Sequence, residues 1–260
     1  MSMSEQLGAL TQASGNQMGL GAAFSLQLGK VTNIKDEKNL NRVKCLPIGA
    51  EDQEETDWCY VMAPMGGKDR GLFLFPQVGD LVVLGYLGND PHRPIVLGSF
   101  WNTDTTPPIP IQDGKSEDYC LRTPQKVEIM IHDESGKEKL TVTMPSGTVV
   151  TLDDEAQQIS MKDKGGDNAL IMDLKGGEVT LKAKSKLTLS AGQTSITLEQ
   201  GGNITEKGNG TISLDGASIK GKAKGQLSMQ GVDAQVKADA SLKLEASGPA
   251  SLKGAILKLN

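Results

Sequence analysis

Residues 179–191 read VTLKAKSKLTLSA, with apolar or small side chains at alternate positions and Thr, Lys or Ser between them. Side chains of a β-strand point alternately to its two faces, so a period of two residues predicts strands with one buried and one solvated face. The same alternation runs, with interruptions at turns, from Val127 to Ala246. This half of the chain is therefore predicted to be all-β.

A longer repeat of about eight residues is superposed on this alternation. A unit this short cannot enclose a core alone, but three chains that each supply one strand per layer can close a triangular prism. We therefore predict that residues 118–260 form an intertwined triple-stranded β-helix in a homotrimer. One large apolar residue from each repeat is assigned to the core of this needle: Leu187, Ile196, Ile204, Ile212, Ile219, Leu227, Val236 and Leu244.

The distribution of aromatic residues fits a narrow core. They make up 3% of the chain, and none follows Tyr119. Two alternatives remain open for this region, a disordered tail and a calcium-binding β-roll. Disorder would not preserve the alternation, and a β-roll needs repeated Gly-Gly-x-Gly-x-Asp motifs, whereas Gly165-Gly166-Asp167 and Gly201-Gly202-Asn203 stand alone.

The first part of the chain predicts a different β-structure. Short strands with turn signals between them, and no helical pattern, indicate a small closed barrel in residues 25–102. The prolines of residues 103–117 predict an extended linker, and residues 1–24 are interpreted as an N-terminal arm. The barrel strands are predicted at Leu26–Ile34, Arg42–Pro47, Asp57–Ala63, Arg70–Pro76, Asp80–Leu87 and Pro94–Phe100.

Charge and cysteine content restrict the partners and the compartment. The net charge of -5 argues against nucleic acid as a partner, because phosphate-binding proteins are basic. Cys45, Cys59 and Cys120 form no even set and no CxxC motif, so we expect free thiols from a reducing compartment. No Lys or Arg precedes Lys30. We therefore expect a protein made in the cytoplasm without a signal peptide.

Candidate sites for chemistry are few. His92 lies beside Asp90 in a turn, and His132-Asp133-Glu134 has the residue types of a metal site but also precedes a hairpin signal, Ser135-Gly136. The carboxylates of Asp153-Asp154-Glu155 are interpreted as another hairpin turn. We expect no catalytic residue, no metal and no cofactor.

Several motifs carry a resemblance to a known family. They are RVKCLPIG at 42–49, PQVGD at 76–80 and GNDPHRP at 88–94, within a longer run from Asp57 to Asn102. This region resembles the OB-fold domain of VgrG proteins and phage baseplate spike proteins. The alternating tail resembles the triple-stranded β-helix of that family. OB-folds often bind single strands on aromatic side chains, but we assign Phe73, Phe75 and Tyr86 to the barrel core because they alternate beside apolar neighbours.

The resemblance implies a function. It implies the structural central spike of a contractile injection machine, which is a phage tail, a tailocin, an extracellular injection system or a type VI-like system, and not an enzyme. The spike would be assembled into the particle and contact the target membrane only transiently. A trimeric tail-fibre-like adhesin is the alternative, but it predicts an aromatic-bearing head that residues 120–260 lack.

The resemblance also implies partners. Only residues 1–24 precede the OB region, where type VI relatives carry a hub domain, so a separate hub protein is expected at that end. The linker 103–117 has no room for the lysozyme domain of one phage relative, which argues against a peptidoglycan hydrolase. The end of the needle lacks a His-x-His pair, so a separate PAAR-type tip protein is expected on a platform of Leu252, Ile256, Leu257, Leu259 and Asn260.

Overall fold

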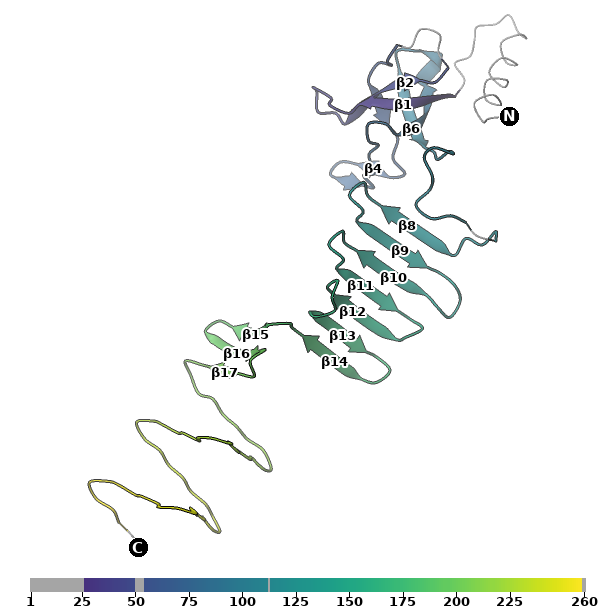
Figure 1. Cartoon of the computed structure of the whole chain (residues 1–260). Coiled ribbons are helices and arrows are strands. Elements are labelled where there is room, and N and C mark those ends of the chain that lie inside the picture. The colour runs from purple at the N-terminus through teal and green to yellow at the C-terminus, as the bar shows by residue number, and fades with distance from the viewer. Residues whose placement is uncertain (1–25, 50–53, 112, 259–260) are drawn as a thin grey trace, which may run out of the picture. The chain divides into compact units, whose positions relative to one another are not determined.

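The computed structural model describes residues 26–49, 54–111 and 113–258. The predicted arm, residues 1–24, and two residues of the predicted tip platform, Leu259 and Asn260, lie outside them. Within the described ranges the regular structure consists of β-strands and one short 3-10 turn, η1 (Leu87–Asn89), as Figure 1 shows. The all-β prediction is confirmed. Internal contacts divide the chain into two units, with the boundary after Lys184.

Five strands close a small barrel. They are β1 (Gln27–Asn33), β2 (Arg42–Pro47), β3 (Cys59–Val61), β6 (Leu81–Tyr86) and β7 (Pro94–Ser99). Their order is β1-β2-β3-β7-β6, and β6 pairs back onto β1. Neighbours are antiparallel except for the parallel pair β3 and β7. Five of the six predicted strands are therefore confirmed.

The barrel core consists of residues at alternate strand positions, as the pattern predicted. Each buried Val or Leu contributes about 1.5–3 kcal/mol relative to an exposed side chain. Contact with Cys59, together with burial, raises the pKa of Cys45, so the Cys45 thiol packs as a neutral group. The seven core residues, each at most 1% exposed, are Val31, Val43, Cys45, Cys59, Val82, Leu84 and Val96.

Two sequence motifs make the turns that position the barrel strands. In the first, Gly79 has φ 100 and its N–H donates to the Val31 carbonyl at 2.8 Å, while the Val31 N–H donates to the Asp80 carbonyl at 2.9 Å. A positive φ is readily available to glycine because it has no Cβ. In the second, the Asp90 carboxylate accepts the His92 N–H at 2.9 Å. The motifs thus shape the barrel turns.

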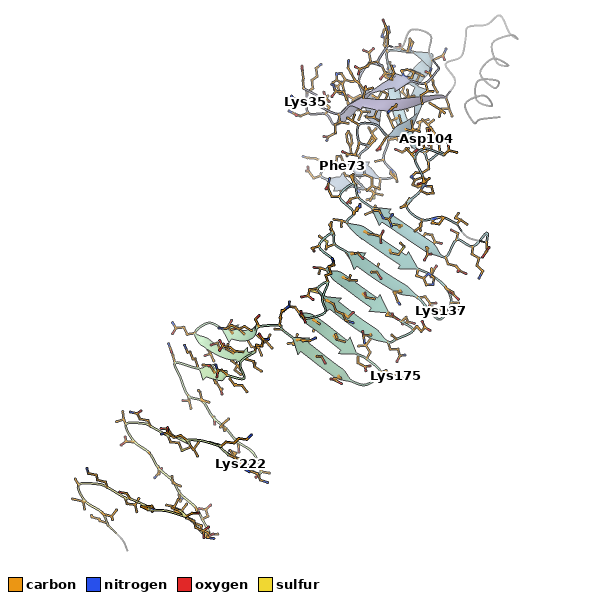
Figure 2. The ribbon with its side chains drawn as sticks, in the orientation of Figure 1. Lys35, Phe73, Asp104, Lys137, Lys175 and Lys222 are labelled. Carbon is orange, nitrogen blue, oxygen red and sulfur yellow. The ribbon has the colours of Figure 1, made fainter. Side chains whose placement is uncertain are left out.

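One predicted strand is largely wrong. Of Arg70–Pro76, only β5 (Arg70–Gly71) is a strand, and it pairs with β4 (Gly66–Gly67) in a separate hairpin. A closed barrel has no free edge to accept another strand. Phe73, labelled in Figure 2, is consequently 71% exposed, so its assignment to the barrel core is wrong. Phe75 and Tyr86 do pack against the core.

The two stacked phenylalanines give a matched test. The rings of Phe73 and Phe75 are 5.6 Å apart, but only Phe75 packs against the core. We expect Phe75→Ala to lower the free energy of unfolding of the barrel by about 2 kcal/mol, and Phe73→Ala by less than about 0.5 kcal/mol. Urea unfolding followed by tryptophan fluorescence reports on this region, because Trp58 and Trp101 are the only tryptophans. Equal losses would contradict this interpretation.

A buried ion pair closes the loop between β1 and β2. The Asp36 carboxylate is 7% exposed and accepts hydrogen bonds from Arg42 Nη2 at 2.8 Å and Nε at 2.9 Å. The N–H groups of Lys38 and Leu40 donate to the same carboxylate, each at 3.1 Å. The hydrogen bonds from Arg42 are the main cause that holds the pKa of Asp36 well below its ordinary range.

This pair predicts how stability depends on pH. Because the folded pKa lies below the unfolded value of about 3.9, the contribution of Asp36 is complete above that value and is lost as the pH falls toward the folded pKa. We expect Asp36→Asn to lower the Tm of the barrel by about 5 °C at pH 7, and by much less near pH 2. Thermal unfolding at both pH values measures this, and an equal deficit at both would contradict it.

The residues after the linker form a seven-stranded antiparallel sheet in which each strand pairs with the next along the chain. The hairpin predicted at Ser135-Gly136 is confirmed, since the Lys137 N–H donates to the Glu134 carbonyl at 2.8 Å. The turn predicted around Asp154 is confirmed as well. The strands are β8 (Asp118–Arg122), β9 (Glu128–His132), β10 (Lys139–Thr143), β11 (Val149–Asp153), β12 (Gln158–Lys162), β13 (Ala169–Asp173) and β14 (Glu178–Lys182).

The second unit begins with three antiparallel strands and then changes character. The strands are β15 (Lys186–Ala191), β16 (Thr194–Glu199) and β17 (Ile204–Lys207), in the order β15-β16-β17. Figure 1 shows the following residues, 208–258, as extended segments joined by bends. In this described stretch no segment pairs with another part of the chain. The bends lie at 209–210, 216–217, 224–225, 232–233, 239–240, 247–248 and 255, and so follow the eight-residue repeat.

The two parts of the predicted needle therefore differ in where their strand partners lie. From Asp118 to Lys207 the strand partners belong to the same chain, which the alternation alone did not reveal. Only residues 208–258 lack partners in the way that an intertwined needle requires. The trimeric β-helix itself stays a prediction.

Candidate functional site: an uncovered apolar surface

One face of the seven-stranded sheet carries two continuous rows of apolar side chains, which we call the apolar sheet face. The strand register places the members of each row directly opposite one another. The first row consists of Tyr119, Ile131, Leu140, Leu152, Ile159, Met172 and Val179, and the second of Leu121, Ile129, Val142, Val150, Met161, Leu170 and Leu181.

Within the first unit, no described residue covers the apolar sheet face. Nine of its fourteen side chains are more than a third exposed, among them Val179 at 63% and Tyr119 at 54%. A hollow of about 580 Å³ lies against it, with Leu140, Leu152 and Ile159 among the lining residues. A contiguous exposed apolar surface of this kind marks an interaction site.

The opposite face of the sheet carries mostly polar and charged side chains, with Met130 and Ile171 among them. Lys139 Nζ lies 2.6 Å from Asp153 Oδ2 across neighbouring strands, and Arg122 pairs with Glu128. The hydrogen bond that the His132 ring donates to Asp118, with Nδ1 2.7 Å from Oδ1, is the main cause that raises the pKa of His132. Cross-strand ion pairs on an open face contribute little each. Their placement marks this face as the more polar of the two.

The three-stranded sheet has the same two-sided character. Leu187, Leu198 and Ile204 lie opposite one another in one row, and the next row consists of Leu189, Ile196 and one charged residue, Glu206. The other face carries a row of Thr188, Thr197 and Thr205. The apolar side is again uncovered, with Leu189 50% and Ile204 74% exposed.

The structure thus brings together the first three predicted core residues, Leu187, Ile196 and Ile204, on one apolar face. Sequence reasoning missed Leu189 and Leu198 as members of that face. The signal was available, because each lies two residues from a predicted core position. Assigning one core residue to each repeat left out the second apolar residue on the same face.

The remaining predicted core residues lie in the unpaired stretch 208–258. They are strongly exposed, and their exposed fractions are 51% for Ile212, 63% for Ile219, 68% for Leu227, 75% for Val236 and 78% for Leu244. The described residues of a single chain do not bury these side chains, so the predicted core requires other chains.

The predicted tip platform is described only in part. Leu252 is 74% exposed, Ile256 79% and Leu257 58%. Their role as a platform stays a prediction, as does the part assigned to Leu259 and Asn260.

The candidate residues for chemistry lie apart from this surface or face solvent. His92 Nδ1 is 2.9 Å from Asp57 Oδ2 on an exposed part of the barrel, and this hydrogen bond is the main cause that raises the pKa of His92. Among the described residues, no three His, Cys, Asp or Glu side chains gather as a metal ion would require. The described residues also contain no helix with the length and apolar character of a membrane span.

The sequence of the barrel is similar to that of known injection-machine proteins. Residues 27–101 match the family described as the type VI secretion system/phage-baseplate injector OB domain. The type VI secretion system spike protein VgrG1a of Pseudomonas aeruginosa is 31% identical over 98 residues, 35% of this chain and 15% of the relative.

Two proteins of Vibrio cholerae are similar over the same share of the chain. The actin cross-linking toxin VgrG1 is 27% identical over 94 residues, 34% of this chain and 8% of the relative. The spike protein VgrG3 is 26% identical over 96 residues, 35% of this chain and 9% of the relative. The matched part is thus a small share of the length of these curated relatives. The closed five-stranded barrel is thus the part of the chain that is similar to type VI secretion system and phage-baseplate injector OB domains.

Proposed function

We propose that this protein is the structural central spike of a contractile injection machine and acts as a homotrimer. The observation that carries the proposal is that each of the two units has apolar side chains that no described residue of that unit covers. The similarity of the barrel to injector OB domains supports the same class of function.

A threefold assembly would bury the apolar sheet faces and would also supply strand partners for residues 208–258. Three apolar sheet faces turned toward a common axis would bury their rows against one another, with the charged faces outward. Residues 208–258 need partners for their backbone groups too, because unpaired buried N–H and C=O groups are costly. Strands from two other chains would supply those hydrogen bonds.

The resulting object would work by stiffness and not by catalysis. Unfolding an intertwined rod requires that all three chains separate, so its stability is expressed as a slow unfolding rate. Such a rod transmits an axial force to the target envelope when a sheath contracts. A separate hub protein would bind at the OB-fold end and a PAAR-type tip protein at the other, within an assembled injection particle.

The oligomeric state tests the proposal directly. The chain has a mass of 27.5 kDa, so light scattering should give three times that mass, and an unboiled sample should migrate as a trimer in an SDS gel until it is heated. A monomer in light scattering would overturn the proposal, since a lone chain leaves its apolar surface in water.

A further inference from the structure

Positive charge near the end of the chain is concentrated in one repeat. Residues 208–260 contain seven lysines and four acidic residues, a net charge of +3 in a chain whose total is -5. Three of the lysines lie in the repeat 218–225, which reads SIKGKAKG and contains no acidic residue. The four lysines outside this repeat are balanced by the four acidic residues. The whole excess is therefore confined to Lys220, Lys222 and Lys224.

Two of these lysines occupy one side of an extended segment, and the third lies at the bend that follows it. Lys220 and Lys222 alternate with Ile219, so in a strand they point away from this predicted core position, and Lys224 belongs to the bend 224–225. All three are exposed, and Figure 2 labels Lys222 in a segment that joins no sheet of its own chain. Within residues 208–258, as far as the structure describes them, the ion pair that forms joins Lys243 to Glu245 and leaves these lysines unneutralised.

We propose that Lys220, Lys222 and Lys224 form a cationic belt around the rod, which binds the headgroup phosphates of an anionic phospholipid bilayer. The inference rests on the proposed trimer, because three chains in register place three copies of this repeat at one level. Three lysines from each chain then give nine ammonium groups. Clustered lysines beside an anionic leaflet attract it strongly within a Debye length.

The geometry favours a bilayer over a nucleic acid. A belt at one level of a rod matches the rim of a planar layer through which that rod passes, whereas a strand of nucleic acid needs a continuous basic groove. The repeats on either side, 210–217 and 226–233, each carry one aspartate and no lysine, so the positive charge does not continue along the rod. Residues 120–260 also lack aromatic side chains on which bases could stack.

A charge-matched pair of variants tests the belt in the full-length protein. The belt variant is K220Q/K222Q/K224Q, and the control is K237Q/K243Q/K253Q, which removes the same number of charges from other repeats. The probe is cosedimentation with phosphatidylcholine vesicles containing about one third phosphatidylglycerol at about 0.1 M salt. Light scattering on each sample reports the oligomeric state separately.

We expect the wild-type trimer to bind these vesicles, to lose binding at about 1 M salt, and to lose at least about tenfold in affinity in the belt variant. The control variant should stay within about threefold of wild type. Absence of wild-type binding, equal losses in both variants, or tighter binding to a DNA duplex than to the vesicles would overturn the belt. A monomer would instead contradict the trimer on which the belt rests.

Discussion

Replacing Leu189 with aspartate is expected to abolish the trimer. Leu189 lies opposite Ile196 on the apolar face of the three-stranded sheet and is 50% exposed in a single chain. In the assembly each copy would lose about 2 kcal/mol of apolar burial. Each copy would also place a carboxylate without a partner in the interior, which costs several kcal/mol more. The threefold arrangement multiplies the penalty by three.

The neighbouring residue supplies the matched control. Thr188 lies on the opposite face of β15, where it pairs with Thr197 and is exposed. Thr188→Asp adds the same carboxylate on the solvated side and should change stability by no more than about 0.5 kcal/mol. Light scattering and unboiled SDS gels compare the two variants. If both remain trimers with equal heat resistance, the apolar face of this sheet is not the trimer interface.

Slow hydrogen exchange throughout residues 211–258 is the second large effect that we expect. A single chain offers these described residues no strand partner, so in a monomer their amides should exchange almost as fast as those of an unfolded chain. Strands from two other chains would protect them by at least about a thousandfold, because opening would then require part of the assembly to separate.

The Leu189→Asp variant serves as the unassembled reference for this measurement by mass spectrometry. The barrel strands β1, β2, β3, β6 and β7 provide an internal standard, since their hydrogen bonds lie within the chain and should protect them in both proteins. Rapid exchange of 211–258 in the wild-type trimer would show that these residues lie outside the rod. Equal protection in both proteins would show pairing within one chain.

The two parts of the predicted needle depend on assembly to different degrees. Residues 118–207 form their strand hydrogen bonds within the chain and need partners only to cover apolar side chains. The stretch 208–258 needs partners for backbone and side chains alike. We infer that the first part can form in each chain before association, and that the second forms only with it.

Much of the barrel could be predicted from the sequence, because its turns have strong local signals. The strand Arg42–Pro47 was predicted with the bounds that the structure shows, and the others within a few residues. The segment containing Phe73 failed for a non-local reason. Its alternation is that of a strand, but the closed barrel leaves no edge where it could pair.

The residues of the candidate interface could be predicted from the sequence, but the pairing of the strands that carry them could not. Alternation decides the face on which each side chain lies, so the apolar faces containing Leu152 and Leu187 follow from local sequence alone. It does not decide which strand lies alongside. That choice depends on whether the chain reverses at each turn, and therefore on backbone conformation.

The sequence by itself determined that this chain is all-β, where its faces are and that its last part repeats about every eight residues. Only the tertiary structure decided which segments find partners within the chain. Each hairpin turn between β8 and β14, and between β15 and β17, contains a residue at positive φ, and no described residue after Gly202 does. A left-handed residue lets the chain fold back on itself, whereas the later bends redirect it without reversal. The residues with positive φ in those turns are Lys126, Gly136, Gly147, Gln157, Gly166, Gly177, Gly192 and Gly202.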